Sequence, residues 1–275
     1  MVSGMQTERD YVLGTHEEEL ARLGLQHRIW RPIAQCCWHK AGITVGSNVL
    51  DVGAGPGYAA TDLAEIVGPS GKVTALERSS KFSHALKERC AARRLTNVAI
   101  HELDLMTDDL PGGPYDYSWC RWVASFVTDP GLLIRKLALV IRPGGKAIFH
   151  EYGHYLTWRF IPRLPSQERF AEEVKASWSA AGGKADIALD LPGYLDENGF
   201  TITSISPLIY CVTPDNYMWQ WPASFIGIGL ARLQELGRVD AVFAREVQDD
   251  FARIAANPEA RLITPLVLEI IAQKS

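Results

Sequence analysis

Residues 48–58 read N-V-L-D-V-G-A-G-P-G-Y and carry the strongest structural signal in this chain. A short apolar run leads into Gly53, Gly55 and Gly57, and a helical pattern follows. Glycine permits a tight turn and lets a ligand approach the backbone with no Cβ in the way. The G-x-G-x-G spacing, with Asp51 before it, differs from the G-x-G-x-x-G of dinucleotide-binding turns. The stretch predicts a strand, a turn and a helix, and the turn either binds a ligand or only packs the helix on the strand.

Short strands and helices alternate on both sides of this stretch. Strands are expected at residues 48–52, 73–76, 98–103, 115–120 and 146–150, and helices at 16–41, 57–67, 79–94 and from Asp129-Pro130 to R-P-G-G. Farther on, helices are expected near 166–181 and 214–256, and strands near 200–206 and 262–271. The alternation predicts an α/β fold of right-handed βαβ units around one parallel sheet.

The composition limits the class of protein. The chain has 275 residues, of which 47% are hydrophobic, and its net charge of −4 attracts neither nucleic acid nor acidic membranes. Five cysteines without framework spacing indicate reduced thiols and a cytoplasmic location. The N-terminus has no apolar run, and no run of about 18 apolar residues occurs elsewhere, so we expect neither a signal peptide nor a membrane span.

An acidic residue, Glu77, ends the second predicted strand in V-T-A-L-E-R, and the ends of neighbouring parallel strands meet at one edge of a sheet. A carboxylate at this point can accept hydrogen bonds from both hydroxyls of an unphosphorylated ribose. The alternative is a solvated strand end. In register with the glycine turn, Glu77 predicts a nucleoside-containing ligand.

These residues resemble the class I S-adenosylmethionine-dependent methyltransferases. Their first motif is similar to L-D-V-G-A-G-P-G. Three later motifs of the family match in the same order: Asp104 in H-E-L-D-L, then Y-D-Y-S-W-C-R-W, then R-P-G-G-K-A-I-F-H-E-Y. The resemblance covers roughly residues 40–155, and this core also resembles the ubiquinone/menaquinone methyltransferases. It implies a Rossmann-like, doubly wound sheet of seven mostly parallel strands, S-adenosyl-L-methionine as cofactor and a small-molecule acceptor.

The resemblance also implies roles for individual residues in binding the cofactor. The backbone of the glycine turn would lie under the methionine part, Glu77 would hold the ribose, and the segment after the third strand would bind adenine. The implied cofactor residues are Asp51, Gly53, Ala54, Gly55, Gly57, Glu77, Arg78, Asp104, Leu105, Cys120 and Arg121. The structural alternatives are a turn cap for Asp104, solvent exposure for the two arginines, and a small buried hydrophobic side chain for Cys120.

The stretch F-H-E-Y-G-H-Y, residues 149–155, contains H-E-x-x-H, the signature of zinc proteases. That signature requires a helix, because only there do positions i and i+4 share a face. Here the motif follows a turn and a β-type run, and on an extended chain His150 and His154 would be roughly 13 Å apart. We therefore predict no metal at this motif. Glu151, His150 and His154 remain candidates for a base that removes a proton from the acceptor.

Parts outside the core are expected to select the acceptor. Residues 1–41 are similar to segments that cover the cofactor as a lid, residues 42–155 form the core, and residues 156–275 carry acceptor-side helices before the last strand, all in a single domain. The expected lid or acceptor residues are Tyr11, Gln26, His27, Tyr152, Trp158 and Trp219. Aromatic side chains can wall an apolar pocket or simply seal the added helices onto the sheet.

The leading function is methyl transfer to oxygen, nitrogen or carbon of a small molecule, without nucleic-acid or membrane partners. A quinone-type C-methyltransferase is the nearest alternative. A cofactor-binding regulator without catalysis and a nicotinamide-dependent oxidoreductase are more distant, and the latter would need its third glycine one position later.

Overall fold

The computed structural model describes residues 17–275. Tyr11 lies outside this range. The helices are α1 (Glu17–Ala41), α2 (Tyr58–Val67), α3 (Ser80–Ala92), α4 (Pro130–Val140), α5 (Pro165–Ala180), α6 (Leu191–Glu197), α7 (Gln220–Glu235) and α8 (Ala241–Ala255), with short 3-10 helices η1 (Tyr155–Thr157), η2 (Ile187–Leu189) and η3 (Tyr217–Trp219). The strands are β1 (Asn48–Val52), β2 (Lys72–Glu77), β3 (Val98–Glu102), β4 (Tyr115–Arg121), β5 (Ile141–His154), β6 (Arg159–Ile161), β7 (Phe200–Leu208), β8 (Cys211–Val212), β9 (Arg261–Ile263) and β10 (Leu266–Lys274).

The helix boundaries follow from capping residues in the sequence. The Asp129 carboxylate accepts a hydrogen bond from Leu132 N–H at the start of α4, where Pro130 occupies the first turn. The helices predicted near 214–256 are η3, α7 and α8. Gly237, with φ +65°, follows α7, and Asp240 caps the start of α8. A left-handed residue and a new N-cap separate the two helices.

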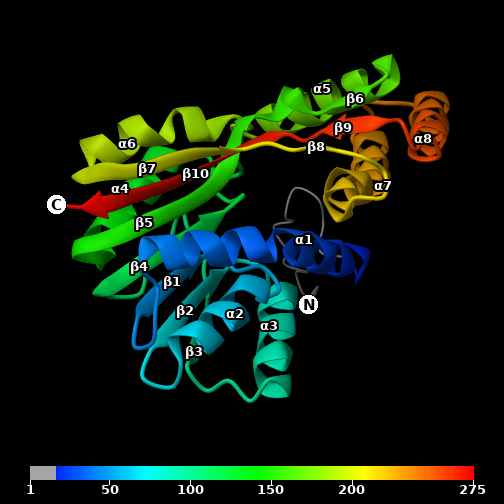
Figure 1. The fold of residues 1–275 in the computed structure, drawn as a ribbon. Helices are drawn as coiled ribbons and strands as arrows, with labels where there is room; N and C mark the ends of the chain where they lie inside the picture. The colour runs from blue at the N-terminus through cyan, green and yellow to red at the C-terminus, as the bar shows by residue number, and fades with distance from the viewer. Residues whose placement is uncertain (1–16) are drawn as a thin grey trace, which may run out of the picture.

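Seven strands form the main sheet, in the order β3-β2-β1-β4-β5-β10-β7 (Figure 1). The first five are parallel, and β10 pairs antiparallel with both β5 and β7. This confirms the predicted mostly parallel, seven-stranded sheet, in which β10 is the antiparallel strand. β5 is longer than predicted because its pairing with β10 continues to His154.

Side chains alternate between the two faces of the sheet, as they must on extended strands. Val49 and Ile148 pack with α1 and α2 on one face, whereas Leu50 and Phe149 pack with α4 and α6 on the other. Figure 1 shows α1, α2 and α3 on the first side and α4 and α6 on the second. The glycine turn after β1 therefore lies at the edge of a sheet that is covered on both faces.

Beyond the carboxyl ends of the strands lies a second, mostly aromatic layer. β6, β9 and β8 form a small antiparallel sheet, and α5, α7 and α8 surround it (Figure 1). Trp30 of α1 belongs to the same hydrophobic cluster as Trp158, Trp219 and Phe225. The predicted division into a lid, a core and an acceptor-side part within one domain stays a prediction.

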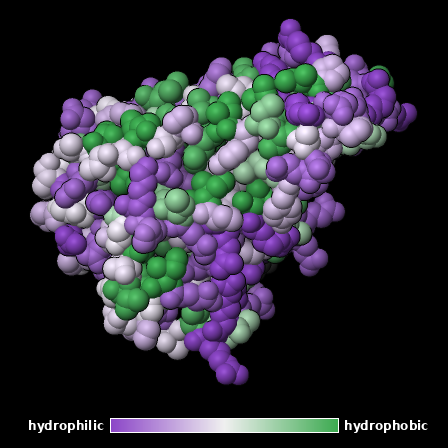
Figure 2. All heavy atoms as spheres, in the orientation of Figure 1, coloured by the Kyte–Doolittle hydropathy of each residue, from purple (hydrophilic) through white to green (hydrophobic). Residues whose placement is uncertain are grey.

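The surface is mixed in character. On the face drawn in Figure 2, hydrophobic residues form separate patches between hydrophilic ones. Among residues 17–275, no helix is both long and apolar enough to cross a membrane. All five cysteines are free thiols.

Candidate functional site

A cavity of about 470 Å³ opens at the carboxyl ends of β1, β2 and β4. Its wall comes from the glycine turn, the ends of β2 and β4, the loops after β3 and β4, and α1. This is the edge of an open α/β sheet at which ligands bind. The predicted residues that line it are Gln26, His27, Asp51, Gly53, Ala54, Gly55, Glu77, Arg78, Asp104, Leu105 and Arg121.

The glycine turn and the end of β2 are joined by a hydrogen bond. The Gly55 N–H donates to Glu77 Oε2 at 2.8 Å, and the Ser79 N–H donates to Glu77 Oε1 at 2.8 Å. Gly55 has φ +55°, and a Cβ built on it would meet no atom within 4 Å, so this glycine borders open space. Burial raises the pKa of Glu77, although the two backbone N–H groups partly counteract that effect. The carboxylate is thus fixed in position beside the turn.

Gly57 serves the fold and not the cavity. It is the N-cap of α2 with φ +82°, and a Cβ there would overlap the Leu86 side chain. Gly57 is not among the cavity-lining residues. The expected contact of this glycine with the cofactor is therefore corrected to close packing of α2 on α3.

Three buried polar atoms of cavity-lining residues lack hydrogen-bond partners among the described residues. One is Nε1 of Trp122, and the two that belong to charged groups are Oδ2 of Asp51 on β1 and Nη1 of Arg121 at the end of β4. Burial raises the pKa of Asp51 to about 7, although Arg121 lowers it, and burial lowers the pKa of Arg121 to about 10. An unsatisfied buried acceptor and donor are costly unless a ligand completes them. Together they complement the ammonium and carboxylate of an amino acid.

The loop after β3 closes another side of the cavity. Asp104 Oδ1 accepts a hydrogen bond from Met106 N–H at 2.9 Å, and its Oδ2 lies 3.8 Å from Arg78 Nη1. Asp104 therefore caps a turn, as the structural alternative expected, while it also lines the cavity beside Leu105. The turn orients this acidic segment toward the end of β2.

α1 contributes two of the predicted lid residues, Gln26 and His27. His27 Nδ1 lies 3.1 Å from Arg121 Nη2, and His27 Nε2 lies 3.0 Å from Asp62 Oδ2. Because a guanidinium only donates, Nδ1 accepts and Nε2 carries the hydrogen. Burial lowers the pKa of His27, in keeping with a neutral imidazole. Asp62 also accepts from Arg31, so α1 is fastened to α2 and β4 at the cavity wall.

The three candidate bases on β5 do not line the cavity. The motif is extended, as predicted, and its side chains alternate across the sheet. His150 points to the α1 face and pairs with Glu269 at 3.3 Å. His154 is exposed, and its Nδ1 lies 3.8 Å from Asp186 Oδ2. Glu151 points to the opposite face and is fully buried. The structure therefore places all three away from the cavity, and a catalytic base among them stays a prediction.

Glu151 instead holds the loop that follows β4. Its Oε1 accepts from Val123 N–H at 2.7 Å and Ala124 N–H at 2.8 Å, and its Oε2 accepts from the Ser125 hydroxyl at 2.7 Å. Burial raises the pKa of Glu151 to about 7, against the lowering effect of these donors. Since Val123 lines the cavity, Glu151 shapes the wall from behind.

Four other predicted residues also lie behind the cavity wall, in the part of the chain that the structure describes. Cys120 is fully buried with its thiol 3.7 Å from Glu151 Oε1, and burial raises the pKa of this thiol well above its ordinary value. It is the small buried side chain that the alternative described. Tyr152, Trp158 and Trp219 are packed in the aromatic layer and do not line the cavity. Tyr152 stacks on Trp122, and Trp122 lines the cavity.

The sequence prediction missed the segment after β4. Trp122, Val123, Phe126, Val127 and Thr128 all line the cavity. Their position just beyond the carboxyl end of a central strand is the signal that could have identified them. Trp122 adopts φ +52°, which is unusual for a bulky residue and turns the chain toward the cavity.

A comparison with protein families agrees with this geometry. Residues 49–145, from β1 into β5, match the model of the methyltransferase domain family. Demethylmenaquinone methyltransferase of Geobacillus sp. (strain WCH70) is 26% identical over 178 residues, which are 61% of this chain and 73% of the relative. The chain carries a methyltransferase domain over residues 49–145, of the class I S-adenosylmethionine-dependent type. S-Adenosyl-L-methionine is its cofactor, and S-adenosyl-L-homocysteine is the product formed from it.

Solved structures show that the methyltransferase shares its fold with proteins of different activities. Geranyl diphosphate C-methyltransferase of Streptomyces coelicolor A3(2), solved with S-adenosyl-L-homocysteine, has a TM-score of 0.59 at 15% identity and covers 90% of this chain and 77% of its own. The [4+2]-cyclase SpnF has a TM-score of 0.57 at 18% identity and covers 88% and 80%. At these identities the likeness concerns the fold alone.

Proposed function

We propose that this methyltransferase transfers the methyl group of S-adenosylmethionine to a small, largely apolar acceptor that enters beside the loop after β4. The observation that carries the proposal is the pairing, in one cavity, of the Glu77 carboxylate at the glycine turn with the unpartnered Asp51 and Arg121 atoms. The cofactor has a ribose at one end and an amino acid at the other, and these groups complement both ends.

The roles of the cofactor-binding residues follow from their chemistry. Glu77 would accept hydrogen bonds from the ribose hydroxyls, because its carboxylate is held beside the open Gly55 backbone. Asp51 would accept from the methionine ammonium, and Arg121 Nη1 would donate to the methionine carboxylate. Arg78, Asp104 and the adjacent Leu105 would bind the adenine side of the cofactor.

When bound, the cofactor supplies an electrophilic methyl group on a sulfonium, so the chain must chiefly align the acceptor and exclude water. His27 is the imidazole of the cavity wall, and both its nitrogens are engaged, one by Arg121 and one by Asp62. We assign His27 the role of positioning Arg121 and not that of a base. An acceptor that is nucleophilic by itself suits this wall.

The apolar character of the acceptor rests on the acceptor-side wall. Phe126, Val127 and Trp122 line this part of the cavity, and Trp122 is backed by Tyr152 and Trp221. The named activities of the similar proteins, on demethylmenaquinone and geranyl diphosphate, also concern molecules with apolar portions. An electron-rich ring carbon of a quinol therefore ranks first among the acceptors, ahead of oxygen and nitrogen nucleophiles.

A transfer assay tests this function. The protein would be incubated with S-adenosylmethionine that carries a deuterated methyl group and with a panel of reduced quinols, phenols and amines. Mass spectrometry should find one labelled methyl group on a quinol and an equal amount of S-adenosylhomocysteine. If the label appeared on phenols or amines instead, methyl transfer would be supported and the quinol would be excluded as the acceptor.

The same assay distinguishes a methyltransferase from a regulator that binds the cofactor without catalysis. Tight binding of S-adenosylhomocysteine with no labelled product across the panel would overturn the proposed catalysis and leave the cofactor site intact. The absence of a nucleic-acid partner and the cytoplasmic location stay predictions from charge and thiol content.

A further inference from the structure

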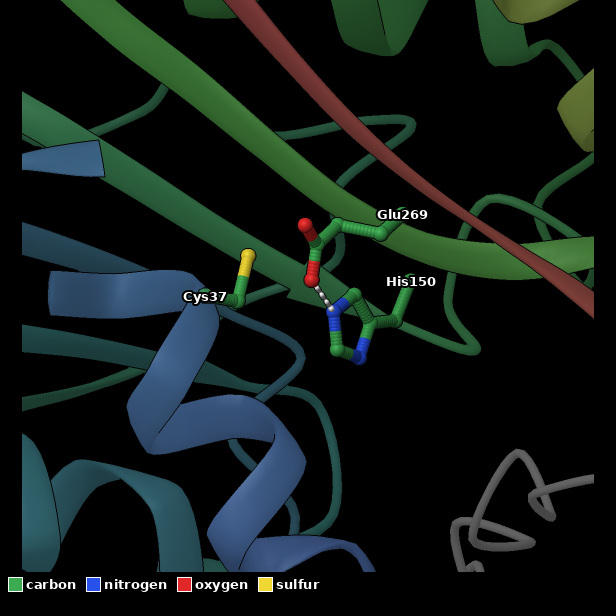
Figure 3. Close-up of side chains that lie close together, drawn as sticks. All are labelled: Cys37, His150 and Glu269. Atoms are coloured by element: carbon green, nitrogen blue, oxygen red, sulfur yellow. Dashed lines mark hydrogen bonds and ion pairs between the residues drawn. The ribbon is translucent and has the colours of Figure 1, made fainter. Parts of the chain in front are cut away.

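A second cluster of reactive side chains lies on the α1 face of the sheet, apart from the cofactor cavity. Cys37 of α1, His150 of β5 and Glu269 of β10 converge there (Figure 3). One potential ligand atom from each lies within 4.8 Å of the other two, and all three residues are buried. His150 and Glu269 are register partners on adjacent strands, so the pair is built into the central pairing of the sheet.

The spacing of His150 and Glu269 matches that of two ligands around zinc. His150 Nε2 lies 3.3 Å from Glu269 Oε2. Nitrogen and oxygen ligands at about 2.0 Å from a tetrahedral zinc are roughly 3.3 Å apart. A thiolate, an imidazole and a carboxylate are all zinc ligands, and three protein ligands leave one position for water. The Cys37 sulfur, on a helix turn that faces the pair, is the third corner.

A metal ion would change the hydrogen bonding of His150. Without a metal, Nε2–H donates to the Glu269 carboxylate, and Nδ1 presents a lone pair that has no partner among the described residues. With a metal on Nε2, the proton would move to Nδ1. The His150 and Trp119 ring centroids are 4.8 Å apart, so the imidazole lies beside an aromatic ring in either state. The tautomer would therefore report whether Nε2 carries a metal or a hydrogen.

We propose that Cys37, His150 and Glu269 form a binding site for Zn²⁺, which the sequence did not predict. Binding would release one proton, that of the Cys37 thiol, and two anionic ligands would neutralise the dication. Lys40 Nζ donates to Glu269 Oε1 at 3.1 Å, which leaves Oε2 for the metal and fixes the carboxylate from its outer side. The ion would fasten α1, which carries His27, to β5 and β10.

The same groups explain why the site is selective for a metal that binds thiolate. Hard cations such as Mg²⁺ do not displace a thiol proton, whereas borderline-soft Zn²⁺ and Co²⁺ do. His150 is shared with the H-E-x-x-H motif, but His154 takes no part because it points away on the extended chain.

Cobalt spectroscopy tests the site independently of methyl transfer. The full chain would be reduced, treated with a chelator and titrated with Co²⁺. We expect one equivalent to give a thiolate-to-cobalt charge-transfer band and the intense visible bands of a tetrahedral site, both abolished by Zn²⁺. Absence of the charge-transfer band in the folded wild-type protein would overturn the proposal.

Variants assign the ligand. Cys37→Ser should lose the charge-transfer band and bind Zn²⁺ at least about 100-fold more weakly, because even outer partners of metal ligands account for about 10- to 100-fold. Cys36→Ser, at the adjacent exposed thiol, is the matched control and should match the wild type. A band that persists in Cys37→Ser and disappears in Cys36→Ser would contradict the assignment. Circular dichroism and S-adenosylhomocysteine binding confirm that each variant is folded.

Discussion

The cofactor side of the molecule and its aromatic layer differ in how their buried side chains are packed. At the carboxyl ends of β1, β2 and β4, polar groups surround a cavity, and Asp51 and Arg121 keep atoms without partners among the described residues. In the aromatic layer, side chains such as Trp219 and Phe170 are almost fully buried against one another, although the indole N–H of Trp158 has no partner there. The first region leaves space for a ligand, whereas the second is filled by its own side chains.

This difference separates the residues that bind from those that stabilise. Removing a group from the cavity wall should mainly weaken ligand binding. Removing a ring from the aromatic layer should mainly lower the free energy of unfolding, since close-packed rings leave a void that collapses only partly. The expected effects on unfolding and on binding decrease from the aromatic layer to the glycine turn.

Trp219→Ala should lower the free energy of unfolding by about 3–5 kcal/mol, because the indole is 2% exposed and packs on Phe160 and Phe251. Denaturant unfolding measures the change. Tyr217→Ala, in the same short helix but 53% exposed, is the control and should change stability by less than about 0.5 kcal/mol. At a temperature where Trp219→Ala is folded, its cofactor affinity should be near that of the wild type. A large loss of cofactor affinity in Trp219→Ala would show that the aromatic layer also supports the cofactor site.

Glu77→Ala should weaken S-adenosylhomocysteine binding about 100-fold, since hydrogen bonds to a charged group contribute about 1.5–3 kcal/mol each. Calorimetric titration gives the dissociation constant. The matched control is Glu102→Gln, the register partner at the exposed end of β3, which should bind like the wild type. Equal affinities of wild type and Glu77→Ala would exclude Glu77 from the ribose site.

Cofactor affinity should rise about tenfold between pH 6 and pH 8, because the pKa of Asp51 is raised to about 7. The cofactor ammonium favours the ionised carboxylate, so below this pKa binding must release a proton, and above it the affinity levels off. Dissociation constants measured across this range check the sign. Asp51→Asn should bind weakly and without this pH dependence. A wild-type affinity that falls as pH rises would contradict the assigned role.

Gly55→Ala and Gly237→Ala should each lower the free energy of unfolding by about 1–2 kcal/mol, because both glycines have left-handed φ angles. Neither new Cβ meets another atom within 4 Å. Only Gly55 lines the cavity, so Gly55→Ala alone should also weaken cofactor binding. Equal affinities in the two variants would show that the cofactor does not approach this turn.

Much of the fold was predictable from the sequence because local signals and tertiary structure agree there. The glycine turn and the strand-ending Glu77 fixed the register of β1 and β2, and Asp129 with Pro130 marked the start of α4. The small sheet of β6, β8 and β9 was missed, since strands of two or three residues carry too little periodicity to be recognised.

The candidate site was predictable where the backbone or a strand end defines it. It was not predictable where the direction of a side chain determines whether the residue reaches the cavity. Glu151 and His150 occupy the expected strand end, yet their side chains point to opposite faces, away from the cavity. Only the pairing of β5 with both neighbours fixes which face each residue takes. Val123 and Phe126 were missed because their loop has no motif and is shaped by Glu151 from behind.

We expect the cavity beside Gly55 and Glu77 to bind the adenosyl and methionine parts of one cofactor molecule. A calorimetric titration of the wild-type protein with S-adenosylhomocysteine, repeated in the presence of saturating adenosine, measures this binding. We expect one site per chain, with competition by adenosine. Absence of heat with S-adenosylhomocysteine, or binding that adenosine leaves unchanged, would contradict it.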